Sequence, residues 1–141
     1  MLTNWIFWAF LSAIFAGATA ILAKVGVAGI DSNAATAIRT TVVFLFAWLI
    51  VLLTDTHGEL AVISRRGWIF LILSGFATGL SWLAYFRALQ LGPASKVAPV
   101  DKLSVVFVIL FAAMFLSERL SPMKIAGGLL ITVGAIVLAY A

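Results

Sequence analysis

The sequence contains no cysteine and a single histidine, and only 10% of its 141 residues are charged. The absence of cysteine excludes disulfides, thiolate metal sites and cysteine nucleophiles. One histidine, His57, and five acidic residues leave too few groups for a typical zinc site or a Ser/His/Asp triad. We therefore expect no catalytic residue, no metal site and no cofactor, and we predict that the protein is not an enzyme.

Hydrophobic residues, in contrast, make up 65% of the chain. Soluble domains average about half apolar and about a quarter charged residues, so this composition is typical of an integral membrane protein. Five apolar runs approach the roughly 20 residues that a helix needs to cross the hydrocarbon, where every backbone group must be paired within its own segment. We predict an all-α integral membrane protein, one domain over residues 1–141, with five transmembrane helices. The expected spans are residues 4–30, 33–53, 67–91, 97–116 and 122–140.

Several local signals mark the ends of these runs. Residues 54–66 form the only extended polar segment, which we expect to include a short interfacial turn. Ser121 is placed to cap the fifth helix, and Pro122 suits its first position, where the missing N–H is harmless. The first run is uncharged from residue 2 to residue 23, which is longer than the apolar core of a signal peptide, so we predict a span that is retained. The candidate caps of the second helix are Asp31, Ser32 and Asn33.

Charged residues lie inside or near the ends of the apolar runs, where hydrocarbon makes an unpaired charge costly. Such residues point by default to a lined cavity or a transport route. The net charge of +4 is scattered among the runs and forms no basic patch, so we expect no nucleic-acid partner. The embedded charged residues are Lys24, Arg39, Arg87, Asp101 and Lys102.

The lengths of the second and fourth runs indicate how deep these charges lie. Only 15 uncharged residues, Thr40–Thr54, follow Arg39, and only 15, Leu103–Ser117, follow Lys102. At about 1.5 Å per residue neither stretch crosses a core of about 30 Å. We therefore expect Arg39 and the Asp101–Lys102 pair to lie inside the membrane, in one layer near the side that holds the loop between the first two spans.

Two interpretations of this layer remain open. Lys24 and Arg87 lie near the membrane boundary, and the long cationic side chains can extend to the lipid headgroups without lining any cavity. If the charges do line a cavity, we predict that Asp101 pairs with Arg39 or Lys24, because low dielectric penalises an unpaired charge. The surplus of positive charge would then favour an anion, or a zwitterion with a carboxylate, as the ligand. Substrate binding or gating is expected at Lys24, Arg39, Trp82, Tyr85, Arg87, Asp101 and Lys102, with Ser81 as a further deep polar residue.

Two further sequence patterns each allow more than one interpretation. Small residues recur at helix-contact spacing, which indicates helix packing within one subunit, a dimer seam or a substrate-facing groove. Glu118 and Arg119 end the fourth run, where a boundary ion pair or a headgroup contact is favoured over proton coupling. The small residues are Ala9, Ala13, Gly17, Gly75, Gly79, Ala126, Gly127, Gly128 and Gly134.

The second half of the sequence resembles half of an EamA repeat, the unit of the drug/metabolite transporter superfamily. The resemblance rests on a proline early in the fourth span, the Glu118–Arg119 pair at its end and the glycines of the last span. In the first half, Lys24 near the end of the first span and Arg39 early in the second also resemble the family pattern. The resemblance covers essentially the whole chain.

This resemblance implies a transporter of small metabolites in the inner membrane of a prokaryote. Family members usually carry two five-helix repeats of inverted orientation, whereas this sequence contains one. The resemblance therefore implies a homodimer, antiparallel and with alternating access, that moves amino-acid-like or anionic metabolites. The alternative is a non-transporting membrane subunit, or a half-transporter that pairs with a different chain.

The loop charges leave the orientation in the membrane open. Four cations at the loops and span ends on one side stand against Lys96 on the other, which favours a single orientation by the positive-inside rule. If the four embedded cations are counted on the second side, the bias vanishes and dual topology is permitted. The four cations of the first side are Arg65, Arg66, Arg119 and Lys124.

Overall fold

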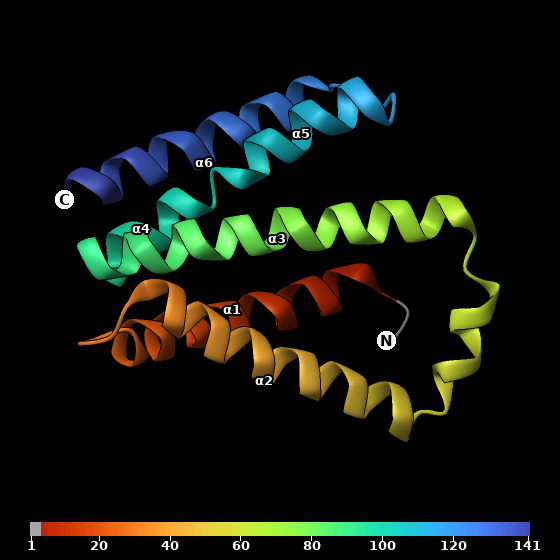
Figure 1. Ribbon diagram of the computed structural model, residues 1–141. Helices are drawn as coiled ribbons and strands as arrows, with labels where there is room; N and C mark the ends of the chain where they lie inside the picture. Colours follow the sequence, from red (N-terminus) through yellow and green to blue (C-terminus); the bar gives the residue numbers. More distant parts are fainter. Residues whose placement is uncertain (1–3) are drawn as a thin grey trace. The chain divides into compact units, whose positions relative to one another are not determined.

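The structure is a computed structural model in which residues 4–141 are described, and these residues are helical without any strand. Five helical stretches are long and apolar enough to cross a membrane, with α4 and α5 together forming the fourth. The prediction of an all-α membrane protein with five spans is confirmed. Figure 1 shows the elements α1 (Trp5–Gly26), α2 (Ser32–Leu53), η1 (Thr56–Val62), α3 (Arg65–Leu91), α4 (Ala94–Asp101), α5 (Ser104–Phe115) and α6 (Pro122–Tyr140).

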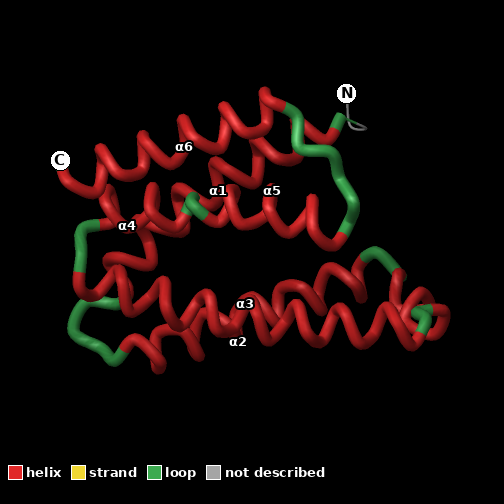
Figure 2. Tube along the Cα trace, turned by 90° about the horizontal axis from the view of Figure 1, so that it is seen from above, coloured by secondary structure: helices red, strands yellow, loops and turns green. Residues whose placement is uncertain are grey.

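The chain divides into two compact units. One unit contains the residues up to Lys24 together with Leu91–Ala141, and the other contains Val25–Gln90. In the first unit, α4 and α5 pack against α6, and Figure 2 shows α5 beside α6. A Cβ at Gly128 on α6 would lie 3.6 Å from Ile109 Cδ1 on α5. At this position glycine serves helix packing within one subunit.

The fourth span bends at Lys102, unlike the continuous run over residues 97–116 that we expected. Pro99 lies inside α4 and has no N–H to donate, which weakens the helix at this point. The hydrogen bonds then tighten to the three-residue spacing: Leu103 N donates to Val100 O at 3.0 Å, and Val106 N donates to Leu103 O at 2.9 Å. The chain remains helical on both sides of the bend, which places Asp101 and Lys102 in a turn within the span.

The first span also ends earlier than expected. α1 stops at Gly26 rather than near residue 30, and a turn over residues 27–30 leads to α2. Gly29 in this turn has a φ of +79°, a conformation that favours glycine. The turn shortens α1 and brings the chain to the cap of α2.

The predicted helix caps are present. Asp31 Oδ1 accepts hydrogen bonds from the N–H groups of Asn33 at 2.9 Å and Ala34 at 3.3 Å. Ser121 Oγ accepts one from Lys124 N at 3.2 Å, with Pro122 in the first turn of α6. The expected short turn in the polar segment is the 3₁₀ helix η1, which links α2 to α3 in the second unit (Figure 1).

Large apolar side chains are exposed on all the spanning helices. Examples are Phe10 on α1, Leu53 on α2 and Leu130 on α6, which are 68%, 73% and 74% exposed. Water would make such surfaces costly, whereas lipid hydrocarbon accommodates them. The fold therefore places helices of this composition in a bilayer.

Candidate functional site

The most distinctive charged residue in the second unit is Arg39 on α2. It lies roughly two turns after the start of the helix, about 10 Å along its axis. Its Cζ is 4.2 Å from the ring centroid of Trp82 and 5.5 Å from that of Phe86, both on α3. Arg39 and Trp82 are half-buried and Phe86 is buried. The guanidinium is thus held over aromatic rings within the membrane span, in a cation–π arrangement.

Helical spacing explains why these rings share one face of α3. Residues at i, i+3 and i+4 lie together on a helix, so Trp82, Tyr85 and Phe86 form one aromatic face. Tyr85 is half-buried. Phe86 was missed by the sequence reasoning, although its spacing from Trp82 was a signal that could have identified it.

Arg39 makes no salt bridge within residues 4–141. The ion pairs in that range are His57–Asp55, Lys102–Asp101 and Lys124–Glu118. A guanidinium stacked on an aromatic face keeps the N–H groups of its edge directed outward, in a fork that matches a carboxylate or phosphate. Arg39 is therefore suited to bind an anionic group.

Lys24 and Arg87 take part in polar contacts near the ends of helices. Lys24 Nζ donates a hydrogen bond of 2.8 Å to the carbonyl of Gly92, just after α3. Arg87 Nη1 donates to Gln90 Oε1 at 3.0 Å, and Gln90 Nε2 donates to Ile30 O at 2.6 Å. Carbonyls near a helix C-terminus lack partners in the helix, so these contacts stabilise the turns. A role of either residue in substrate binding stays a prediction.

Asp101 forms its ion pair with a residue that we did not name as its partner. Its Oδ2 is 3.4 Å from Lys102 Nζ, in the bend of the fourth span. Pairing of Asp101 with Arg39 or Lys24 stays a prediction. Ser81 is exposed on α3, and its role in binding stays a prediction as well.

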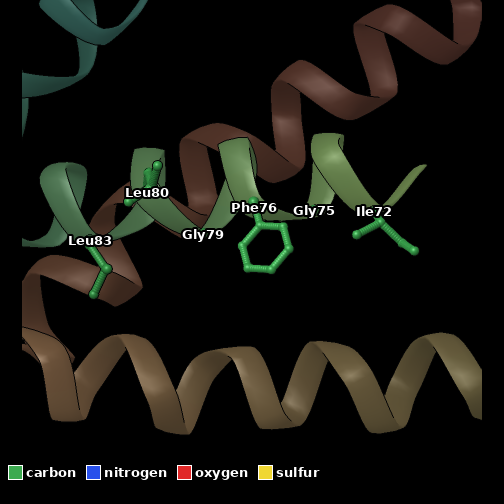
Figure 3. A pocket seen from close by; sticks show the side chains of 6 residues that line it. All are labelled: Ile72, Gly75, Phe76, Gly79, Leu80 and Leu83. Atoms are coloured by element: carbon green, nitrogen blue, oxygen red, sulfur yellow. The ribbon is translucent and has the colours of Figure 1, made fainter. Parts of the chain in front are cut away.

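A groove of about 410 Å³ runs along the middle of α3 (Figure 3). Its lining repeats at helical spacing and contains no charged side chain. Figure 3 shows Phe76 and Leu83 projecting from the same side of α3. Such a surface offers no polar group to orient a charged metabolite, in contrast to the Arg39 site. The groove is lined by Ile72, Gly75, Phe76, Gly79, Leu80 and Leu83.

The five apolar spans define a multi-pass membrane protein, and one of them carries Arg39 over an aromatic ring. The EamA-like transporter family matches residues 3–140, and the chain belongs to this family. A protein of Sinorhizobium sp., named an uncharacterized transporter in the cobO 3′ region, is 52% identical over 139 residues, covering 99% of each chain. No solved structure matches the chain. The family and this relative support a transporter role.

Proposed function

We propose that the protein is a secondary transporter of small metabolites that carry a carboxylate or another anionic group. The observation that carries this proposal is Arg39, which lies inside a membrane span, lies over the ring of Trp82 and makes no salt bridge with an acidic residue of its own unit, Val25–Gln90. A half-buried guanidinium without a counter-ion in its own unit favours an anionic ligand, because each desolvated charge costs several kcal/mol. The substrate carboxylate binds the edge of Arg39 while the aromatic face holds the guanidinium in place.

The working unit that we propose is an antiparallel homodimer in the cell membrane of a prokaryote. Inverted repeats around a central site are a common basis of alternating access, and five spans in each copy supply such repeats only when two copies insert in opposite orientations. Asp101 and Lys102 lie in a bend of the fourth span, and interrupted helices are frequent at transporter binding sites. We therefore propose that the Asp101–Lys102 turn also takes part in transport.

Reconstituted transport tests the proposal at Arg39. Purified protein in liposomes is loaded with a panel of amino acids and organic acids, and exchange of the labelled compounds is measured. We expect Arg39→Leu and Lys102→Leu to abolish flux of the transported acid while the amount of inserted protein stays the same. Arg66→Leu is the matched control, because Arg66 also lies over a ring of α3, Phe70, at 5.7 Å, but at the first turn of that helix.

Three results are distinguished by this experiment. Loss of flux in both variants with normal flux in Arg66→Leu supports a substrate pathway along these residues. Normal flux in Arg39→Leu would overturn the assignment of Arg39 to substrate binding and make its stacking a structural feature. Flux for none of the compounds by the wild-type protein, with co-purification of a different membrane chain, would favour the half-transporter alternative.

A further inference from the structure

A second cavity lies in the first unit, at the turn between α5 and α6. It has a volume of about 150 Å³ and combines two kinds of lining. Apolar side chains of α5 form one part, and the charged residues of the turn and of the start of α6 form the other. The lining consists of Val108, Ile109, Ala112, Glu118, Arg119, Leu120 and Lys124.

The cavity is lined by two cations, Arg119 and Lys124, and by one acidic residue, Glu118. Glu118 Oε2 lies 3.0 Å from Lys124 Nζ, so these two charges neutralise each other. Arg119 is exposed and makes no salt bridge with any residue in 4–141. Its guanidinium presents a fork of donors that matches the oxygens of a phosphate. The cavity therefore favours a ligand with one phosphate group.

Backbone contacts hold the turn against the end of α5. Glu118 N donates to Ala112 O at 3.1 Å, and Ser117 has a φ of +55° that turns the chain at this point. Lys124 is held on the other side by the bond from its N–H to Ser121 Oγ. These bonds position the charged residues beside the apolar wall formed by α5.

The position of the cavity in the membrane distinguishes a lipid from a soluble phosphate. The turn connects two spanning segments, Ala94–Phe115 and Pro122–Tyr140, and so lies at the membrane boundary. Ala112 and Val108 lie about one and two turns back from the end of α5, which is about 5 and 10 Å into the hydrocarbon. A ligand whose phosphate binds Arg119 would therefore place an apolar tail along α5.

We propose that this cavity binds one anionic phospholipid, with its phosphate on Arg119 and an acyl chain against Val108, Ile109 and Ala112. Basic pockets beside membrane helices recognise lipid headgroups by this combination of charge and apolar contact. Because Lys124 is paired with Glu118, Arg119 is the cation of this cavity that can bind the phosphate. This inference is independent of the substrate and of the Arg39 site.

Lipid retention measured by native mass spectrometry tests the site. The protein is reconstituted in equal amounts of phosphatidylglycerol and phosphatidylcholine, extracted in mild detergent, and the lipids bound to each chain are counted. We expect about one retained phosphatidylglycerol, and about fivefold weaker retention in Arg119→Gln, the effect of one basic residue near an anionic lipid. Arg65→Gln is the matched control, because Arg65 is also exposed at a span boundary, at the start of α3.

A second variant and a soluble probe complete the test. Ala112→Phe fills the apolar part without changing charge and is expected to reduce phosphatidylglycerol retention as well. Inorganic phosphate and glycerol phosphate, added at millimolar concentration, are expected not to displace the lipid. Equal retention of the two lipids, equal loss in Arg65→Gln and Arg119→Gln, or displacement by inorganic phosphate would each overturn the proposal.

Discussion

Arg39 illustrates how a charged residue is accommodated within a membrane span. Its cation–π contact with Trp82 contributes about 2 kcal/mol where water is excluded. Desolvation of the guanidinium costs several kcal/mol, so the stack offsets only part of the penalty. The part of the desolvation cost that the stack does not offset favours any state in which an anion contacts Arg39. This gives a physical reason for anionic selectivity.

The ring of Trp82 is expected to position Arg39 rather than to fill space. Trp82→Phe keeps an aromatic face and is expected to leave the KM for the transported acid within about threefold of the wild-type value. Trp82→Leu removes the face and is expected to raise this KM about tenfold, which corresponds to a loss of about 1.4 kcal/mol, a large part of the cation–π contribution. Flux in liposomes at a series of substrate concentrations gives both values.

Trp68→Leu serves as the control for these variants, because Trp68 lies at the opposite end of α3. A KM that rises equally in Trp82→Phe and Trp82→Leu would show that the shape of tryptophan matters and not its aromatic face. An unchanged KM in both variants would remove Trp82 from the site.

The sequence identified which charged residues are embedded, but not what they contact. Arg39 and Trp82 were both predicted site residues, yet they are 43 positions apart and nothing in their local sequence shows that they meet. Lys24 and Gly92 are separated by 68 positions. Such contacts depend on the packing of distant helices, which the periodicity of single segments does not contain.

At the scale of the helices, local signals predicted the beginnings better than the ends. Asp31, Ser121 and Pro122 occupy the expected positions because a capping side chain needs only the two or three residues that follow it. The end of α1 at Gly26 and the bend at Lys102 were not predicted. Pro99 was a local signal for the bend that the prediction did not use, because a proline inside a helix removes one of its hydrogen bonds.

The cap of α2 allows a prediction about stability. Asp31→Ala removes the acceptor for two N–H groups and is expected to lower the free energy of unfolding by about 1 kcal/mol. Asp31→Asn retains an acceptor and is expected to change it by only a few tenths of a kcal/mol. Unfolding in mixed micelles by titration with sodium dodecyl sulfate, followed by circular dichroism, measures the difference.

Asn33→Ala is the control for the cap, because Asn33 is exposed beside Asp31 and accepts no bond from the first turn that the structure shows. A loss in Asn33→Ala equal to that in Asp31→Ala would indicate that the turn is sensitive to any change. No loss in Asp31→Ala would mean that tertiary packing alone holds the start of α2.

For the whole molecule, we expect both orientations in the membrane at comparable abundance. The chain has no cysteine, so a single cysteine introduced in η1, for example Thr56→Cys, reports the location of that segment. A membrane-impermeant maleimide added to intact cells is expected to label about half of the Thr56→Cys protein, as an antiparallel homodimer requires. Labelling after permeabilisation gives the total.

A second labelling position completes the orientation measurement. Ala141→Cys, at the opposite end of the five spans, should also be labelled in about half of the molecules. Complete protection at one position with complete labelling at the other would establish a single orientation and contradict the antiparallel homodimer. In that case the half-transporter that pairs with another chain becomes the preferred arrangement.

The sequence alone determined that this is an all-α membrane protein with five spans, because hydrophobicity over about 20 residues is a property of each segment by itself. It also determined the caps and the set of embedded charges. Tertiary structure decided that Arg39 lies on Trp82 and Phe86 and that Glu118 pairs with Lys124. These features depend on the relative positions of side chains from different turns and helices, and only the folded chain fixes those positions.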